Sequence, residues 1–367
     1  MIQYLKLGSL TRIRTGKLDA NAADDNGKYP FFTCSKEPLS INTCSYDCEC
    51  VLVAGNGDLN VKYYDGKFDA YQRTYIIESL DKTKLMVKYL YCFLDLYVEI
   101  LRQQAIGGVI KYIKLGNLAD AIIPVPVIEK QREIIEIFEK CNGTIAYRHQ
   151  ELLLMDQLVK SRFIEMFGDP VTNLKGWTTK PLLDMGNCKN GMNFHTGDSG
   201  MEMHCLGVGD FKDLSFIDGT DHLPVISLNE APPEESMLRD GDIVFVRSNG
   251  NKALVGRCLV VYPRSTPTTY SGFCIRYRLT SSEVDTTYLL RVLKTDSMRK
   301  KMAGRGANIQ NLNQQILAAL DIPLPPIKLQ QAFAAFVEQV DKSKFEIQQS
   351  LEKLEILKKS LMQQYFG

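Results

Sequence analysis

The chain has 367 residues, 45% hydrophobic and 24% charged, a composition that excludes a disordered protein and leaves room for more than one core. The N-terminus shows no secretory-signal pattern, and no apolar run reaches the about 20 residues of a membrane span, so we expect a cytoplasmic protein without membrane contact. The net charge of +1 excludes a uniformly basic surface, so any surface that binds a polyanion must be local.

The first 120 or so residues alternate strand and turn signals. The apolar run Val51–Ala54 is followed by Gly55-Asn56-Gly57 and then by a second run, Val61–Tyr64, which predicts two strands joined by an Asn-Gly loop. Asp65-Gly66 predicts a further hairpin turn. The apolar stretch Leu85–Leu101 contains three charged residues and predicts a core helix.

A proline-containing segment follows and introduces a long helical pattern. Pro124 and Pro126 cannot lie inside a helix and favour an extended entry strand, so a helix is expected just after them. Apolar residues then recur at alternating spacings of four and three, interrupted at Arg148 and Arg162. The apolar positions of this heptad pattern are Ile134, Phe138, Cys141, Ile145, Leu152, Met155, Val159 and Met166.

The second globular part, residues 171 to about 316, has the same layout with little sequence in common. The run Ile243–Val246 meets an Arg-Ser-Asn-Gly-Asn loop and then the run Leu254–Tyr262, which again predicts strand, Asn-Gly loop, strand. Tyr270 leads into a further strand, as Tyr71 does in the first part. Glycine-rich turns close both parts, at residues 107–111 and 304–310, so two α+β domains of one fold with different loops are expected.

The segment from Leu118 to Gly168 recurs from Leu317 to Gly367, and the offset of 199 residues holds throughout. A repeat of this length indicates a duplicated domain rather than a solenoid. Identical pairs include Ile123 and Ile322, Pro124 and Pro323, Gln131 and Gln330, and Phe167 and Phe366. The second heptad pattern comprises Phe333, Val337, Val340, Ile347, Leu351, Leu354, Leu361 and Tyr365.

A helix of roughly 35 to 40 residues rises about 1.5 Å per residue and needs a partner along its apolar seam. The other copy of the repeat is the natural partner. The alternative is that each helix lies as an amphipathic helix on its own globular domain.

This order of variable domain, Ile-Pro-x-Pro segment with a following glutamine, and long helix ending in Phe-Gly, repeated once, closely resembles the specificity subunit of type I restriction-modification systems. The resemblance covers essentially the whole chain. It implies α+β target recognition domains at residues 1–125 and 171–324, each reading one half of a bipartite DNA site. It also implies conserved helical regions at 126–170 and 325–367, which form an antiparallel coiled coil with pseudo-two-fold symmetry.

The same resemblance implies the partners. They are double-stranded DNA, two copies of a modification (DNA adenine methyltransferase) subunit that uses S-adenosylmethionine, and a restriction subunit that translocates and cuts DNA with ATP. Unlike loops on matching frames predict an asymmetric target, and a symmetric scaffold predicts equivalent docks for two copies of one partner.

Candidate DNA-binding residues are Lys, Arg, Asn and Gln side chains on the loops, with a tyrosine in each domain for packing on sugar or base. In the first domain they are Asn56, Asn60, Lys62, Tyr71, Gln72, Arg73 and Lys111. In the second they are Arg247, Ser248, Asn249, Asn251, Lys252, Tyr270, Arg305, Asn308 and Gln310. Asn-Gly and glycine-rich loops are also explained by turn geometry alone.

Motifs for catalysis are not found in the sequence: it contains no Gly-x-x-x-x-Gly-Lys-Ser/Thr phosphate loop and no Asn-Pro-Pro-aromatic element, so the chain is expected to be no enzyme. Ten cysteines without an export signal predict free thiols in a reducing compartment. Zinc binding by Cys34, Cys44, Cys48 and Cys50 is disfavoured because their spacings fit paired Cys-x-x-Cys knuckles poorly. The scattered set Cys188, His195, His204 and Cys205 is disfavoured further.

Three functions remain open at this point. The first is a non-catalytic DNA-sequence reader and scaffold, which the repeat and the unlike loops favour. The second is a coiled-coil protein-interaction scaffold that binds no DNA. The third is an enzyme whose site is assembled from loops without a known motif. An inactive specificity cassette is a further possibility within the first.

Overall fold

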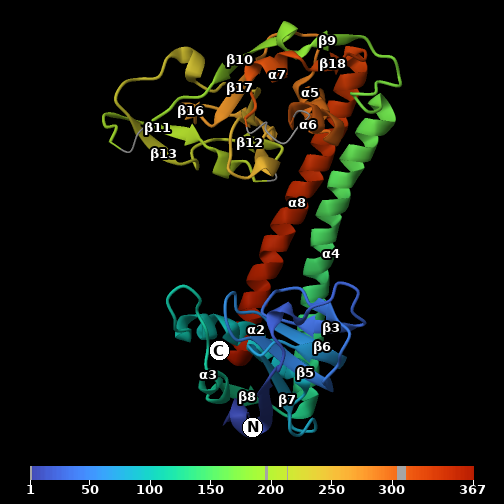
Figure 1. Cartoon of the computed structure of the whole chain (residues 1–367), viewed down its shortest axis with the longest axis vertical. Coiled ribbons are helices and arrows are strands. Elements are labelled where there is room, and N and C mark those ends of the chain that lie inside the picture. The colour runs from blue at the N-terminus through green and yellow to red at the C-terminus, as the bar shows by residue number, and fades with distance from the viewer. Residues whose placement is uncertain (1, 195–196, 213, 304–310) are drawn as a thin grey trace. The chain divides into compact units, whose positions relative to one another are not determined.

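Two helices of 40 residues each, α4 (Ile128–Phe167) and α8 (Ile327–Phe366), follow the two proline-containing segments as predicted (Figure 1). The computed structural model describes all residues except 1, 195–196, 213 and 304–310. It divides into unit 1, Met1–Glu151 with Glu346–Gly367, and unit 2, Leu152–Phe345. Each unit therefore contains one globular part, a piece of α4 and a piece of α8.

Unit 1 builds its globular part from eight strands and three α-helices in its described residues. The elements are β1 (Gln3–Lys6), α1 (Leu7–Leu10), β2 (Thr11–Thr15), β3 (Tyr29–Phe32), β4 (Leu39–Ile41), β5 (Tyr46–Ala54), β6 (Val61–Ala70), β7 (Thr74–Ser79), α2 (Val87–Gln104), α3 (Leu115–Ala119) and β8 (Ile122–Val125). Six strands form a sheet in the order β2-β7-β5-β6-β3-β4, in which β3 and β6 run parallel. Strand β8 pairs separately with β1.

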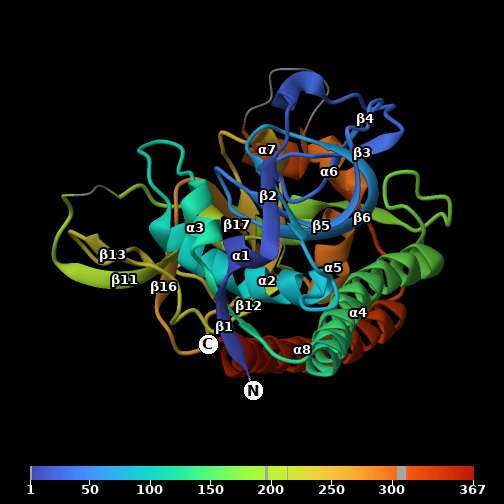
Figure 2. The ribbon, with the colours of Figure 1, turned by 90° about the horizontal axis from the view of Figure 1, so that it is seen from below.

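Helix α2 confirms the core helix predicted from the apolar stretch Leu85–Leu101. It packs against β5 and β6 (Figure 2). Its inward face, which includes Tyr89, Leu90 and Phe93, is buried. No helix in the part of the chain that the structure describes is long and apolar enough to cross a membrane.

The hairpin predicted at Asp65-Gly66 is wrong. Strand β6 runs through both residues, which face Glu49 and Cys48 on β5 in an unbroken antiparallel ladder. The turn between the two strands is instead the Gly55-Asn56-Gly57 loop. The local Asp-Gly signal is overridden because eight consecutive residues of β6, 61 to 68, pair with β5.

Unit 2 repeats this frame with additions. Its elements are β9 (Thr179–Pro181), β10 (Gly186–Asn190), β11 (Met201–Leu206), β12 (Phe216–Asp218), β13 (Val225–Leu228), β14 (Asp242–Val246), β15 (Cys258–Tyr262), β16 (Thr268–Tyr270), β17 (Cys274–Leu279), α5 (Thr286–Leu293), α6 (Asp296–Ala303), α7 (Gln314–Ala318) and β18 (Asp321–Pro323). Its described strands form a sheet in the order β10-β17-β14-β15-β12, a three-stranded sheet β13-β11-β16, and the pair β18-β9.

The two frames correspond strand by strand. The order β7-β5-β6 with a parallel outer strand β3 matches β17-β14-β15 with a parallel outer strand β12. Helix α7 begins and ends 199 residues after α3. The expected pair of α+β domains sharing one fold is therefore confirmed, and the differences lie in loops and in the added sheet of unit 2.

Helices α4 and α8 pack antiparallel in each unit. In unit 1 the early residue Phe138 of α4 stacks on Phe366 at the end of α8, with ring centroids 6.0 Å apart. In unit 2 the early residue Phe333 of α8 meets Phe163 and Phe167 at the end of α4. Many seam positions, such as Val159 and Leu351, are buried as predicted. The helix ends also pack on globular cores, so the two alternatives for the helices both hold in part.

A buried glutamine joins each globular part to the start of its helix, and the same bonds occur twice. Gln131 is fully buried; its Oε1 accepts from the Met86 backbone N–H (2.9 Å), and its Nε2 donates to the carbonyls of Lys84 (2.7 Å) and Pro126 (2.9 Å). Gln330 is bonded in the same way to residues that lie 199 positions further on, namely Asp285, Glu283 and Pro325.

A tyrosine and the Phe-Gly ending complete the junction. The Tyr89 hydroxyl donates to the Pro124 carbonyl at 2.7 Å, and the Tyr288 hydroxyl donates to the Pro323 carbonyl at 2.9 Å. Phe366 packs on the Tyr89 ring, and Phe167 packs edge-on to the Tyr288 ring with centroids 4.8 Å apart. These aromatic pairs add stabilisation beyond the area they bury.

Replacing Gln131 by Ala leaves a buried N–H and two carbonyls without partners. We expect the free energy of unfolding to fall by about 1–3 kcal/mol for a buried group left unpaired, and the same loss for Gln330→Ala. Urea unfolding followed by circular dichroism measures it. Gln150→Ala, at an exposed position of the same helix α4, is the control, and an equal effect of all three changes would contradict the role of the network.

Candidate nucleic-acid interface

Backbone hydrogen bonds gather three loops of unit 1 that are far apart in the sequence. The Gly55 N–H donates to the Arg73 carbonyl (2.8 Å), and the Gly57 N–H donates to the Lys111 carbonyl (2.9 Å). Asn56 forms a bridge with Tyr112. The loop after β5, the turn before β7 and the glycine-rich segment therefore form one surface, which brings together the predicted residues near positions 56, 73 and 111.

Unit 2 gathers its loops with the same pattern. The Arg247 N–H donates to the Phe273 carbonyl (2.8 Å), and the Leu312 N–H donates to the Arg247 carbonyl (2.8 Å). Ser248 forms a bridge with Asn311, which is the counterpart of Tyr112 at the offset of 199 residues. The loop after β14 and the turn before β17 thus occupy the same places as their counterparts in unit 1.

The bonding pattern identifies equivalent positions whose side chains differ. Asn56 corresponds to Ser248, because each forms the bridge to the segment that precedes the repeat. Arg73 corresponds to Phe273, because each carbonyl receives the N–H at the start of the loop. A guanidinium at one position and an apolar ring at the other offer different chemistry to a ligand.

Three predicted side chains of unit 1, Gln72, Arg73 and Lys111, are exposed, and Asn56 and Tyr71 are half-buried. Asn60 has a structural role, because its Nδ2 donates to the carbonyls of Cys34 (2.8 Å) and Asp58 (2.9 Å).

Lys62, at the start of β6, donates to the Asn60 side-chain oxygen, and its burial lowers the pKa of the ammonium. This half-buried position makes Lys62 a weaker candidate for phosphate contact than Lys111.

In unit 2, Asn251 and Lys252 are exposed, and Arg247, Ser248 and Asn249 are half-buried. The Arg247 guanidinium donates to the Gly272 carbonyl at 3.1 Å, and the Asn249 side chain accepts from the Asn251 N–H. The Asn251 side chain accepts from the Ala253 N–H, so both asparagines also shape the loop. Arg305, Asn308 and Gln310 lie outside the described residues.

The prediction that Tyr270 presents its ring to DNA is wrong. Tyr270 is fully buried, and its hydroxyl donates to the Lys189 carbonyl at 3.2 Å. The counterpart of Tyr71 is Ser271, because Tyr71 bridges Leu18 as Ser271 bridges Met192. A shift of one residue in an extended segment turns the side chain to the opposite face.

Sequence reasoning missed two exposed rings on these surfaces. Phe273 is 62% exposed and Tyr112 is 37% exposed. Exposed aromatic rings offer stacking surfaces for bases. Phe273 lies two residues after Ser271, as the predicted residue Arg73 lies two residues after Tyr71. Because the sequence comparison paired Tyr71 with Tyr270 instead of Ser271, Phe273 was not predicted.

The cysteines considered for zinc do not converge in the described residues. Cys50 is buried in β5, where burial raises the pKa of its thiol, whereas Cys44 is exposed. No group of three or more His, Cys, Asp or Glu side chains is placed to hold a metal within the part that the structure describes. His195 lies outside that part.

Comparison with known proteins places this frame in one family. The family model described as "Type I restriction modification DNA specificity domain" matches residues 2–153 and 234–358. The type I restriction enzyme EcoDI specificity subunit of Escherichia coli is 27% identical over 375 residues, covering 92% of this chain and 80% of the relative. The MjaVIII specificity subunit of Methanocaldococcus jannaschii is 22% identical, covering 98% and 91%.

Solved structures agree in fold. The type I restriction-modification S subunit from M. genitalium superposes with a TM-score of 0.59 at 16% identity, covering 100% of this chain and 96% of that one. A chain from a structure of type I complex assembly and conformational transition gives the same TM-score and identity, covering 99% and 97%. The chain therefore belongs to the family of type I restriction-modification specificity subunits.

Proposed function

We propose that this chain reads an asymmetric, bipartite DNA site, with unit 1 reading one half and unit 2 the other. The observation that carries the proposal is the pair of loop surfaces, which share their backbone bonding but differ in their side chains. Arg73 in unit 1 is equivalent to Phe273 in unit 2, and Asn56 is equivalent to Ser248. Matching frames give matching docking on a duplex, while unlike side chains select unlike bases.

The remaining predicted residues are proposed to contact DNA in the following roles. Lys111, Arg73 and Lys252, which are exposed, hold phosphates or guanine edges, and the exposed amides of Gln72 and Asn251 read adenine. The exposed rings of Phe273 and Tyr112 contact sugar or base.

The duplicated helices are proposed to set the distance between the half-sites and to carry the partners. Because the junctions built on Gln131 and Gln330 are equivalent, a modification subunit that docks at one has a matching dock at the other. The modification subunits then supply S-adenosylmethionine-dependent adenine methylation, and a restriction subunit supplies ATP-driven translocation and cleavage. The chain itself contributes specificity and no catalytic group.

Exchange of residues 171–316 for the corresponding domain of another specificity subunit tests the modular reading. We expect one half of the methylated site to change and the other half to stay the same, because unit 1 keeps its loops. Sequencing of methylated DNA from cells with the matching modification subunit measures both halves at once. A change in both halves contradicts independent reading.

Removal of one heptad from each helix, residues 145–151 and 344–350, tests the proposed ruler. Seven residues span about 10 Å, or about three base pairs at 3.4 Å each, and a heptad deletion keeps the apolar seam nearly in phase. We expect a shorter gap between unchanged half-sites in the methylated motif.

The control exchanges the two heptads between the helices, which keeps both lengths and predicts an unchanged gap. A gap that stays the same after the double deletion contradicts the ruler.

A further inference from the structure

Each unit has a pocket at an equivalent place in the duplicated frame. The pocket of unit 2, about 340 Å³, lies between α4, α5, α6 and the start of β15. The pocket of unit 1, about 600 Å³, lies between α8, α2 and the start of β6. Asp156 and Lys160 line the first, and their counterparts at the offset of 199 residues, Glu355 and Lys359, line the second.

The unit 1 pocket neutralises much of its own charge. Lys358 pairs with Asp95 at 3.1 Å, and Arg102 pairs with Glu99. Five basic side chains and three carboxylates line it in all.

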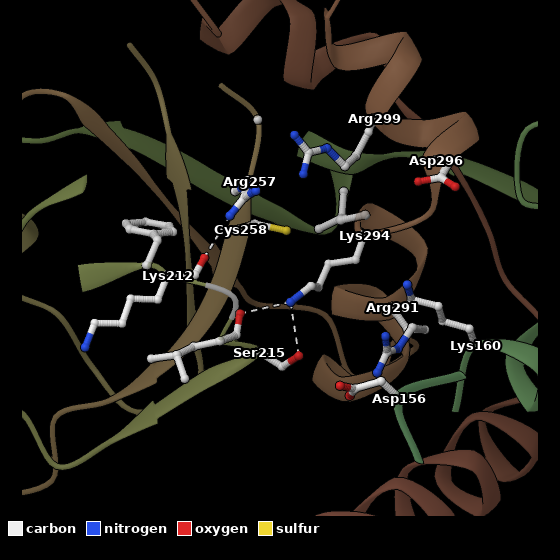
Figure 3. A pocket seen from close by; sticks show the side chains of 14 residues that line it. Asp156, Lys160, Lys212, Ser215, Arg257, Cys258, Arg291, Lys294, Asp296 and Arg299 are labelled. Atoms are coloured by element: carbon white, nitrogen blue, oxygen red, sulfur yellow. Dashed lines mark hydrogen bonds between the residues drawn. The ribbon is translucent and has the colours of Figure 1, made fainter. Parts of the chain in front are cut away.

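The unit 2 pocket has a different balance, with six basic side chains and two carboxylates. The basic side chains are Lys160, Lys212, Arg257, Arg291, Lys294 and Arg299. Figure 3 shows Lys294 between Arg257 and Arg299 on one side and Arg291 and Lys160 on the other, while the Lys212 ammonium points away from them.

Two of these cations are held by neutral oxygens. The Lys294 ammonium donates to the Leu214 carbonyl (2.9 Å) and the Ser215 hydroxyl (3.0 Å). The Arg299 guanidinium donates to the Ala253 carbonyl (2.9 Å). Among the described residues, neither cation has a carboxylate oxygen within ion-pair distance, so these bonds position the positive charges without cancelling them.

Burial makes this concentration of charge costly. Burial lowers the pKa of Lys294, and the nearby positive charges of Arg291 and Lys344 lower it further. Burial also lowers the pKa of Arg291, although the carboxylates of Asp156 and Asp341 act in the opposite direction. An anion bound among the cations would stabilise their charged forms. The polar lining does not suit an apolar ligand, although the volume lies in the range of small-ligand sites, about 300–1,000 Å³.

We propose that the unit 2 pocket binds a phosphate group, whereas its neutralised counterpart in unit 1 does not. Arg and Lys are the side chains that hold phosphate in proteins.

The neighbourhood of the pocket favours a phosphate of the DNA backbone as the ligand. Arg299 donates to the carbonyls of Ala253 and Val255, which end the loop of the candidate reading surface. Arg257 lies two residues after Val255, immediately before β15. This choice of ligand rests on the proposed function. A small free phosphate or pyrophosphate is the other source of the same chemistry.

The test uses the full chain in complex with its modification subunit and compares Lys160→Gln with Lys359→Gln. Both lysines are exposed, lie at equivalent positions of α4 and α8, and lose one charge in the same way. Fluorescence anisotropy gives the affinity for DNA with the methylated motif and for unrelated DNA between about 50 and 200 mM salt. A second arm titrates inorganic pyrophosphate into the DNA-free complex by calorimetry.

For Lys160→Gln we expect the slope of log affinity against log salt to become shallower by about 0.9, equally on both DNAs, and no change for Lys359→Gln. Arg291→Gln should act in the same direction, and unchanged melting temperatures show that the variants are folded. An unchanged slope together with pyrophosphate binding that Lys160→Gln abolishes assigns the pocket to a small phosphate.

An unchanged slope without pyrophosphate binding overturns the proposal, as does an equal loss in Lys359→Gln. Failure of the proposed function has a different signature, because the wild-type complex would then prefer no DNA sequence. In that case the calorimetric titration with pyrophosphate still tests whether the pocket binds a phosphate group.

Discussion

The backbone of the two proline-containing segments is the constraint on which the rest of this structure depends. Proline has no N–H, and the carbonyls of Pro124 and Pro126 are directed into the protein, where an unpaired polar group is costly. The Tyr89 hydroxyl and the Gln131 amide satisfy them, and the same Gln131 side chain accepts from the N-cap residue of α2. One set of bonds therefore fixes the entry strand, the start of the long helix and the core helix of the globular part together.

Because the same bonds recur at Tyr288 and Gln330, each globular part is attached to the helices in the same way. The two units differ where these bonds are absent, in the loops after β5 and β14 and in the added sheet of unit 2. The two pockets show the same contrast between the helices and the globular parts. The helices contribute an acidic residue and a lysine at equivalent positions, Asp156 and Lys160 in one pocket and Glu355 and Lys359 in the other. The lining residues from the globular parts differ in charge.

Much of the fold could be predicted because its signals are local or repeated. Prolines, heptad spacing and the offset of 199 residues located α4 and α8 to within a few residues, and Asn-Gly loops located the central hairpins. The failures arose where tertiary pairing decides. Asp65-Gly66 lies inside β6 because β5 pairs with residues on both sides of this dipeptide. Tyr270 is buried because the equivalent segments of the two units differ by one residue in length. The pockets were not predictable, since they join side chains from elements that are distant in the sequence.

The central claim is that two unlike surfaces on one repeated frame read two unlike half-sites. Methylation-sensitive sequencing of DNA from cells that express this chain with its modification subunit, compared with the same cells lacking this chain, tests it most directly. The account predicts a new methylated motif made of two short, different halves separated by a fixed gap. A new motif that is palindromic or continuous would contradict it, as would the absence of any motif when the modification subunit is active beside another specificity subunit.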